Sequence, residues 1–209
     1  MASALQPSQL REQFGDIDIY LFDQLLRGRI DDTATVLDAG CGSGRNLLFL
    51  ARAGMRVYGV DSSADAIDAA RNRLAEVAPD FDPARLSVQS VDSLSFASAS
   101  MDVVISSAVL HFASGETQFL ACVDEMWRVL APGGMLFCRL ASSIGIEDQV
   151  RQIQGRRHQV PDGSTRFLVD EEFLMQTTSR LGGTLMDPLK TTVVQRMRAM
   201  TTWVLRKAP

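Results

Sequence analysis

Three glycines and an aspartate form the stretch of this sequence whose residue types and spacing point most directly to chemistry. In "VLDAGCGSGRN" the glycines are Gly40, Gly42 and Gly44, and Asp38 stands two residues before the first of them. Glycine clusters mark backbone that must bend sharply or approach a ligand closely. An apolar run precedes the cluster and a helical stretch follows it. Doubly wound sheets bind nucleotides at such a junction.

The spacing of these glycines separates two classes of ligand. A dinucleotide fingerprint reads G-x-G-x-x-G, whereas this stretch reads G-x-G-x-G and has Arg45 at the sixth position. A helix N-terminus stabilises an anion, but the carboxylate of Asp38 would repel a phosphate there. The stretch therefore favours a ligand that carries an ammonium group and no phosphate.

The elements that must position these residues follow a βαβ rhythm, in which short apolar runs alternate with helical stretches. The pattern predicts strands at 35–39, 56–60, 86–91, 101–107 and 135–140, and helices at 16–29, 44–53, 62–78, 115–130 and 170–181. Two β-rich runs, 184–194 and 198–206, leave no room for a crossover helix and should pair as an antiparallel hairpin. The expected fold is α/β and Rossmann-like. It has a doubly wound, seven-stranded, mostly parallel sheet in three α/β/α layers, with a C-terminal antiparallel hairpin.

The chain is expected to be one domain, because 209 residues suit a single hydrophobic core. Its expected parts are an N-terminal helical cap, a core, an irregular acceptor-site loop or lid, and a C-terminal helix with the hairpin. These parts span 1–30, 31–140, 141–169 and 170–209. In the first helix Ile19, Phe22 and Leu26 are expected to share the buried face.

The glycine stretch resembles motif I, D-x-G-x-G-x-G, of the class I S-adenosylmethionine-dependent methyltransferases. Four further motifs resemble that family in the same order: "VYGVDSS" with Asp61, "VQSVDSLSF" with Asp92, "MDVVISSAVLHF" and "EMWRVLAPGGMLF". The five motifs cover about residues 30–140. The length and general style are similar to the small-molecule group of the family (methyltransferase type 11/12-like). The resemblance implies S-adenosylmethionine as the cofactor.

The resemblance also implies roles for individual residues. Asp38 and Gly40 would hold the methionine amino group, Cys41 and Gly42 would form the backbone turn, and Asp61 with Ser62 would meet the ribose. Asp92 and Ser93 would frame the adenine, and Ser107 would stand beside the donor methyl group. The alternatives are a helix N-cap for Asp61 and a turn residue for Asp92, and Cys41 is better explained as a small residue than as a nucleophile.

On the acceptor side, His111 is the candidate general base or acceptor contact, and its alternative is packing of a loop. Arg156, Arg157 and Arg166 lie near His158 and could clamp an anion, although such a run is more often a solvated loop. Tyr20 and Arg166 are the further candidate acceptor contacts. Transfer itself would be an in-line displacement that depends mainly on alignment.

Composition limits the kinds of partner and the location that are expected for this chain. The net charge of −4 disfavours nucleic acid, and no apolar run is long enough to span a bilayer. The N-terminus does not look like a secretory signal. Three cysteines without CxxC spacing favour a reducing cytoplasm and no zinc site.

The sequence after residue 107 lacks the Asn/Asp-Pro-Pro motif of adenine methylation, a Pro-Cys nucleophile and the aspartate of metal-dependent enzymes, so a small-molecule acceptor and no metal are expected. A monomer or weak homodimer is expected.

Three functions follow from these observations. The leading hypothesis is a methyltransferase that acts on a small molecule. The second is a non-catalytic S-adenosylmethionine-binding protein, which would keep the glycines and Asp61 but fill its acceptor pocket. The third is an NAD-dependent oxidoreductase, which Arg45 and the C-terminal hairpin disfavour.

Overall fold

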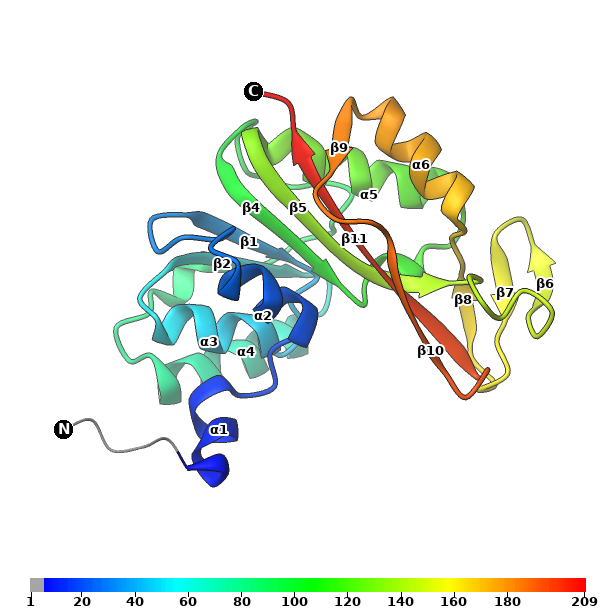
Figure 1. The fold of residues 1–209 in the computed structure, drawn as a ribbon. Coiled ribbons are helices and arrows are strands. Elements are labelled where there is room, and N and C mark those ends of the chain that lie inside the picture. The colour runs from blue at the N-terminus through cyan, green and yellow to red at the C-terminus, as the bar shows by residue number, and fades with distance from the viewer. Residues whose placement is uncertain (1–5) are drawn as a thin grey trace.

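The computed structural model describes residues 6–209, and Figure 1 gives the arrangement of its elements. Residues 1–5, the first part of the expected cap and of the stretch compared with a secretory signal, lie outside the described residues. The helices are α1 Pro7–Phe14, α2 Ile19–Leu26, α3 Arg45–Arg52, α4 Ala64–Val77, α5 Glu116–Val129 and α6 Glu171–Arg180, with short 3-10 helices η1 Pro83–Arg85 and η2 Leu110–Phe112.

A mixed sheet runs through the molecule. Within residues 6–209 it contains eight strands, seven of them in the order β10-β11-β5-β4-β1-β2-β3, with β9 paired to β11. The strands are β1 Thr35–Ala39, β2 Arg56–Asp61, β3 Leu86–Val88, β4 Met101–Ser107, β5 Leu130–Ser142, β9 Gly183–Leu185, β10 Lys190–Val194 and β11 Arg198–Lys207. The first five pair in parallel, and β11 pairs antiparallel with β5, β9 and β10. The expected fold class is confirmed, with β9 as an additional short strand.

Helices cover both faces of this sheet (Figure 1), which gives the three expected layers. Alternation along β1 divides its side chains between the faces. Val36 packs with Leu47 of α3 and Ile67 of α4, whereas Leu37 packs with the core under α5 and α6, which includes Phe119. Both sides of the parallel strands are buried, as parallel sheets require.

The N-terminal helix differs from its prediction. Residues 16–29 hold only α2, and a separate helix, α1, precedes it. Ile19 and Leu26 are 70% and 73% exposed, whereas Leu21 and Gln24 are buried. Both sets of positions have helical spacing, so the sequence could not choose between them. Contact with the sheet selects the face of Leu21.

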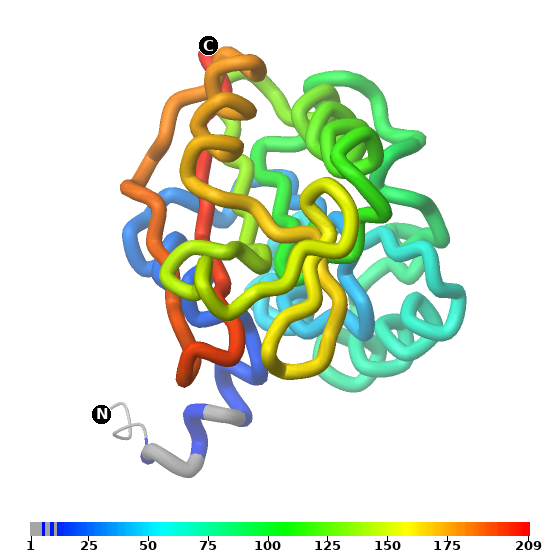
Figure 2. Tube along the Cα trace, turned by 90° about the vertical axis from the view of Figure 1, so that its right-hand side faces the viewer, coloured from blue at the N-terminus to red at the C-terminus, as the bar shows by residue number. Residues whose placement is uncertain are grey.

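The segment 141–169 is not irregular as predicted. It contains a small antiparallel sheet of β6 Arg151–Gln154, β7 Arg157–Gln159 and β8 Thr165–Phe167. In Figure 2 these strands, in yellow, face the viewer beside the turn of the C-terminal hairpin. All four residues of β6 are exposed, and three of them are polar. They therefore lack the alternation of apolar and polar residues from which a strand can be predicted.

Candidate active site

The glycine turn joins β1 to α3, and its backbone conformation explains its composition. Gly40, Gly42 and Gly44 all have positive φ angles, of 85°, 54° and 82°. A Cβ atom at Gly40 would also collide with the side chain of Val109. The N–H groups of Gly40 and Cys41 donate to the carbonyl of Val60 at 2.8 and 2.9 Å. The turn is thereby fixed to the end of β2.

Asp61, the last residue of β2, faces the same turn. Its Oδ2 accepts from the N–H of Gly42 and its Oδ1 from the N–H of Ser63, both at 2.9 Å. The N-cap of α4 is Ser63, whose hydroxyl accepts from Ala66 N–H, so Asp61 is not the helix cap. A carboxylate offers about four acceptor sites, and two bonds leave Asp61 able to accept two more from a ligand.

A cavity of about 450 Å³ opens over the turn, and we call it the glycine cavity. Of the residues expected at the cofactor, Gly40, Gly42, Asp61 and Ser62 line it. The walls away from the turn come mainly from Val91, Cys122 and the segment 108–113 without His111.

Other residues expected at the cofactor lie outside the lining of the glycine cavity. Cys41 is buried, and burial raises the pKa of its thiol, which agrees with its interpretation as a small packing residue. Asp92 is half-buried and Ser93 is exposed. Burial first and the nearby charge of Asp92 second raise the pKa of the lining residue Cys122 to about 11. Asp92 therefore lies close to the cavity without lining it.

Asp38 lies beneath the turn and is 1% exposed. Its Oδ2 accepts a long hydrogen bond of 3.5 Å from Asn46, and its Oδ1 has no partner among residues 6–209. Burial raises the pKa of Asp38 to about 7, against the smaller opposing effects of Asn46 and Arg45. A buried carboxylate oxygen without a partner is costly, and a cationic group on a ligand would remove that cost.

A second cavity, of about 310 Å³, adjoins the first. It is lined by four arginines, Arg45, Arg139, Arg166 and Arg198, and we call it the arginine cavity. Ala108 lines both cavities. Its φ angle of 66° is unusual for a residue with a side chain, and its N–H donates to the carbonyl of Arg139 at 2.7 Å. The two cavities therefore meet at one small residue.

His111 lines the arginine cavity and is 7% exposed. The N–H of Ala141 donates to its Nδ1 at 3.4 Å, so in the neutral ring the proton resides on Nε2. Burial lowers the pKa of His111 to about 4, and the charges of Arg166 and Arg139 add to the effect. His111 is thus a neutral N–H donor. This arrangement favours a contact to the acceptor over a general base.

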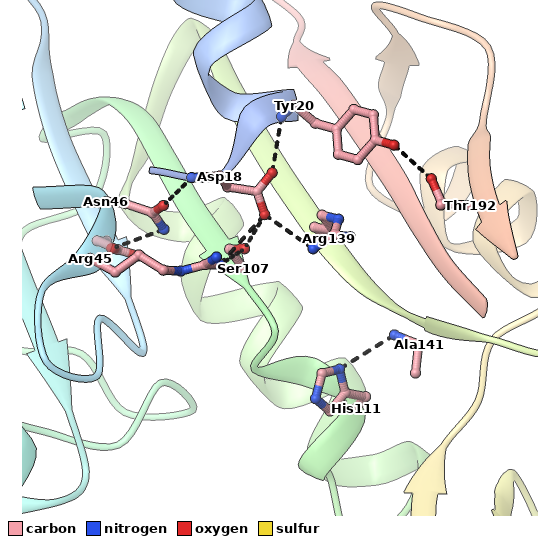
Figure 3. A network of polar contacts seen from close by, with 10 residues as sticks. Asp18, Tyr20, Arg45, Asn46, Ser107, His111, Arg139, Ala141 and Thr192 are labelled. Carbon is pink, nitrogen blue, oxygen red and sulfur yellow. Dashed lines mark hydrogen bonds and ion pairs between the residues drawn. The ribbon is translucent and has the colours of Figure 1, made fainter. Parts of the chain in front are cut away.

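Asp18 is the centre of a buried polar network that sequence reasoning missed (Figure 3). It is 3% exposed, and its Oδ2 accepts from Ser107 at 2.9 Å and from Arg139 at 3.3 Å. Arg45 lies 3.5 Å from the same oxygen and donates to the Ser107 hydroxyl at 2.9 Å. Ser107 is thereby bound to Asp18 and does not line the glycine cavity. An aspartate before an apolar helix signals a cap, and Asp18 does cap α2 through Tyr20 N–H. The residues that bind its other oxygen are distant in the sequence, so no local pattern predicts these contacts.

Tyr20 does not line the arginine cavity itself but contacts a residue that does. Its hydroxyl makes a 2.6 Å hydrogen bond with Thr192, which lines that cavity (Figure 3). The guanidinium of Arg139 lies 5.3 Å from the centre of its ring. Tyr20 therefore supports the cavity wall through Thr192.

The expected arginine clamp is only partly present. Arg166 lines the arginine cavity. Arg156 instead pairs with Asp170 at 2.8 Å and covers the ring of Phe173 at 4.0 Å. Arg157 is exposed, and the ring of His158 bonds the carbonyl of Arg156. Arg156, Arg157 and His158 therefore do not form an anion clamp, in line with the alternative that such a run is a solvated loop.

Two further features bear on the class of site. The part of the chain that the structure describes holds no group of three His, Cys, Asp or Glu side chains placed to bind a metal ion. No helix between residues 6 and 209 is both long enough and apolar enough to cross a membrane.

Comparison with known proteins agrees with the fold and the motifs. Residues 37–138 match the family described as "Methyltransferase domain". The chain is 34% identical over 117 residues to trans-aconitate 2-methyltransferase of Azoarcus sp. (strain BH72), covering 54% of this chain and 42% of that protein. It is 32% identical over 126 residues to malonyl-[acyl-carrier protein] O-methyltransferase of Serratia marcescens, covering 59% and 46%. The chain thus matches less than half the length of either relative.

Among solved structures, an S-adenosylmethionine-dependent methyltransferase of Methanosarcina mazei superposes with a TM-score of 0.74 at 19% identity. That likeness covers 88% of this chain and 97% of the other, and at this identity it shows the fold. The sheet and its helices define a doubly wound α/β protein, a class in which ligands bind beyond the carboxyl ends of the strands. The family match, the motif order and this fold identify the chain as carrying a methyltransferase domain of the class I S-adenosylmethionine-dependent type. S-adenosylmethionine is the cofactor of that class.

Proposed function

We propose that this chain transfers a methyl group from S-adenosylmethionine to a small molecule bound in the arginine cavity. The observation that carries the proposal is the meeting of the two cavities at Ala108. A donor in the glycine cavity and an acceptor in the arginine cavity would have their reacting ends on either side of this residue. Methyl transfer needs such alignment more than it needs an acid or a base.

Residues that line the glycine cavity or lie beneath its turn fit the proposed cofactor. Asp61 has acceptor capacity left for the ribose hydroxyls, and the unpartnered Oδ1 of Asp38 suits an ammonium group. The glycine turn leaves room for close approach, and Asp92 with Ser93 would stand near the adenine. When bound, the cofactor supplies an activated methyl group on a sulfonium. The chain then holds the two partners and excludes water.

The arginine cavity also bears on the alternatives. A non-catalytic binding protein would be expected to fill its acceptor pocket, whereas a space of about 310 Å³ adjoins the cofactor region here. Arg45 at the sixth position of the glycine stretch and the match to a methyltransferase domain both weigh against an NAD-dependent oxidoreductase. The cavity size favours a small acceptor over a nucleic acid.

Calorimetric titration with S-adenosylhomocysteine and with NAD tests the cofactor assignment. We expect micromolar binding of the first and no binding of the second. Asp61→Ala should weaken S-adenosylhomocysteine binding at least about 30-fold, because hydrogen bonds to a charged group contribute about 1.5–3 kcal/mol each. Asp65→Ala, an exposed aspartate four residues away on α4, is the matched control and should leave the affinity unchanged. Binding of NAD alone would overturn the proposal.

A further inference from the structure

The arginine cavity also indicates what kind of acceptor it takes. We propose that the acceptor is a small organic acid with at least two carboxylates, and that the methyl group joins one of its carboxylate oxygens. This inference rests on the proposed function and adds to it the substrate class and the methylated atom.

The charge balance of the cavity is the first argument. Four guanidinium groups line it, those of Arg45, Arg139, Arg166 and Arg198. Two carboxylates oppose them. Asp18 lies behind the wall, within 3.3–3.5 Å of Arg139 and Arg45. Asp162 is on the lining, and hydrogen bonds from Ser164 keep its pKa below the usual range.

Two formal positive charges therefore remain for a ligand. The whole chain carries a net charge of −4, so the excess of positive charge in this cavity is opposite in sign to the charge of the protein as a whole. A dianion would neutralise it.

The donors of these arginines are not exhausted by the protein. The Nε of Arg139 is buried and has no partner among residues 6–209. Arg166 donates from one nitrogen to the Thr165 carbonyl at 2.9 Å and lies 4.9 Å from the centre of the Phe112 ring. A guanidinium has five N–H donors in a fork that matches carboxylates. Several of these donors remain for a bound acid.

The chemistry of His111 is the second argument. A hydroxyl acceptor must lose a proton, and a general base would take it. His111 accepts from Ala141 at Nδ1 and therefore carries its proton on Nε2, so it can donate a hydrogen bond but is not placed to remove a proton. A carboxylate oxygen is already ionised at neutral pH and needs no base. The lining thus suits an acceptor that arrives deprotonated.

The proposed step balances without a further reactant. One carboxylate oxygen forms a bond to the methyl carbon while the carbon–sulfur bond breaks, and the electron pair of that bond stays on sulfur. The products are a methyl ester and S-adenosylhomocysteine, and no proton is gained or lost. A second carboxylate stays ionised among the arginines and holds the acceptor in place. The cavity volume lies at the lower end of the range for ligand sites, which limits the acid to a small molecule.

The experiment uses the full chain with S-adenosylmethionine labelled in its methyl group and three acceptor pools. The first pool holds aliphatic di- and tricarboxylic acids, the second their amides, and the third catechols, thiols and amines. We expect label only in the first pool. Mild alkali should then release it as methanol, because methyl esters hydrolyse there and methyl ethers, thioethers and amines do not.

Variants connect the product to the cavity. Arg166→Gln and Arg198→Gln should each raise the KM for the acid at least tenfold while the Kd for S-adenosylhomocysteine stays within twofold. Arg157→Gln is the matched control, because this arginine is exposed on the neighbouring strand β7 and does not line the cavity. It should change neither constant.

The outcomes separate the two proposals. Label in the second or third pool, or label that resists alkali, would overturn the inference and leave the proposed function standing. Binding of S-adenosylhomocysteine with no label in any pool would also overturn the inference. Absence of S-adenosylhomocysteine binding would instead remove the proposed function itself.

Discussion

Replacing Asp18 with asparagine removes the carboxylate that pairs with Arg45 and Arg139 behind the cavity wall. Asparagine caps a helix as well as aspartate does and has nearly the same size, so α2 keeps its N-cap and its packing. The change therefore isolates the charge. It leaves a guanidinium that is 23% exposed, that of Arg139, without its carboxylate partner.

The magnitude follows from burial and distance. Removing one partner of a buried ion pair costs about 3–5 kcal/mol. Here the nitrogen–oxygen distances are 3.3 and 3.5 Å, and the second arginine, Arg45, is 36% exposed, so water screens part of the interaction. We expect Asp18→Asn to lower the free energy of unfolding by about 2 kcal/mol. In a chain of this length that corresponds to a fall in Tm of roughly 4–8 °C.

Urea denaturation and thermal unfolding of the purified variants measure this effect. Asp16→Asn is the matched control: this aspartate lies two residues away, is 52% exposed and pairs with Arg73 at 3.3 Å. An exposed pair contributes less than about 1 kcal/mol. If the two variants lose equal stability, or if Asp18→Asn stays within about 0.5 kcal/mol of the parent chain, the buried charge network does not stabilise the fold as argued.

Three further predictions concern the two cavities. Gly40→Ala should abolish S-adenosylhomocysteine binding in calorimetry, because its φ is 85° and its Cβ would collide with Val109, whereas Gly115→Ala, whose Cβ would meet nothing within 4 Å, should leave binding intact. Without ligand, stability should fall as pH rises from about 4 to about 7, because the unfolded chain releases the proton of Asp38 first. Affinity for S-adenosylhomocysteine should weaken as pH falls from 8 to 6, since its ammonium group favours the ionised Asp38, and Asp38→Asn should flatten both profiles. At saturating donor, the transfer rate measured against pH should show no change near pH 6.5 from the titration of His111, because its pKa lies at about 4. A change in rate near pH 6.5 that disappears in His111→Gln would instead show that His111 acts as a general base.

The parts of the fold that sequence could predict are those in which burial leaves a pattern. The strands at 35–39 and 101–107 were predicted with the observed bounds, because most of their residues are buried and each contains a short apolar run. The small sheet in the segment 141–169 was missed because the exposed residues of β6 carry no such pattern. The predicted buried face of α2 was wrong for Ile19 and Leu26, although Phe22 does pack against the core. Two sets of positions had helical spacing, and only the tertiary contact distinguishes them.

The site divides in the same way. The glycine turn and Asp61 were expected together, and they line one cavity, because a sequence motif fixes backbone geometry locally. The arginine cavity could not be predicted, since its arginines come from α3, β5, β8 and β11 and share no spacing. Of the four, only Arg166 was predicted to contact the acceptor. Charged residues that the fold brings together from separate elements form no recognisable pattern in a single sequence.

The opposite character of the two cavities has a consequence for turnover. Asp61 lines the glycine cavity and Asp38 is buried beneath its turn, while the arginine cavity carries a surplus of positive charge. Under the proposals made above, transfer across Ala108 leaves a donor product with one positive charge fewer and an acceptor product with one negative charge fewer. Each cavity would then hold its product less tightly than its substrate. The reaction itself would loosen both occupants, so product release would be driven by the same charges that assembled the complex.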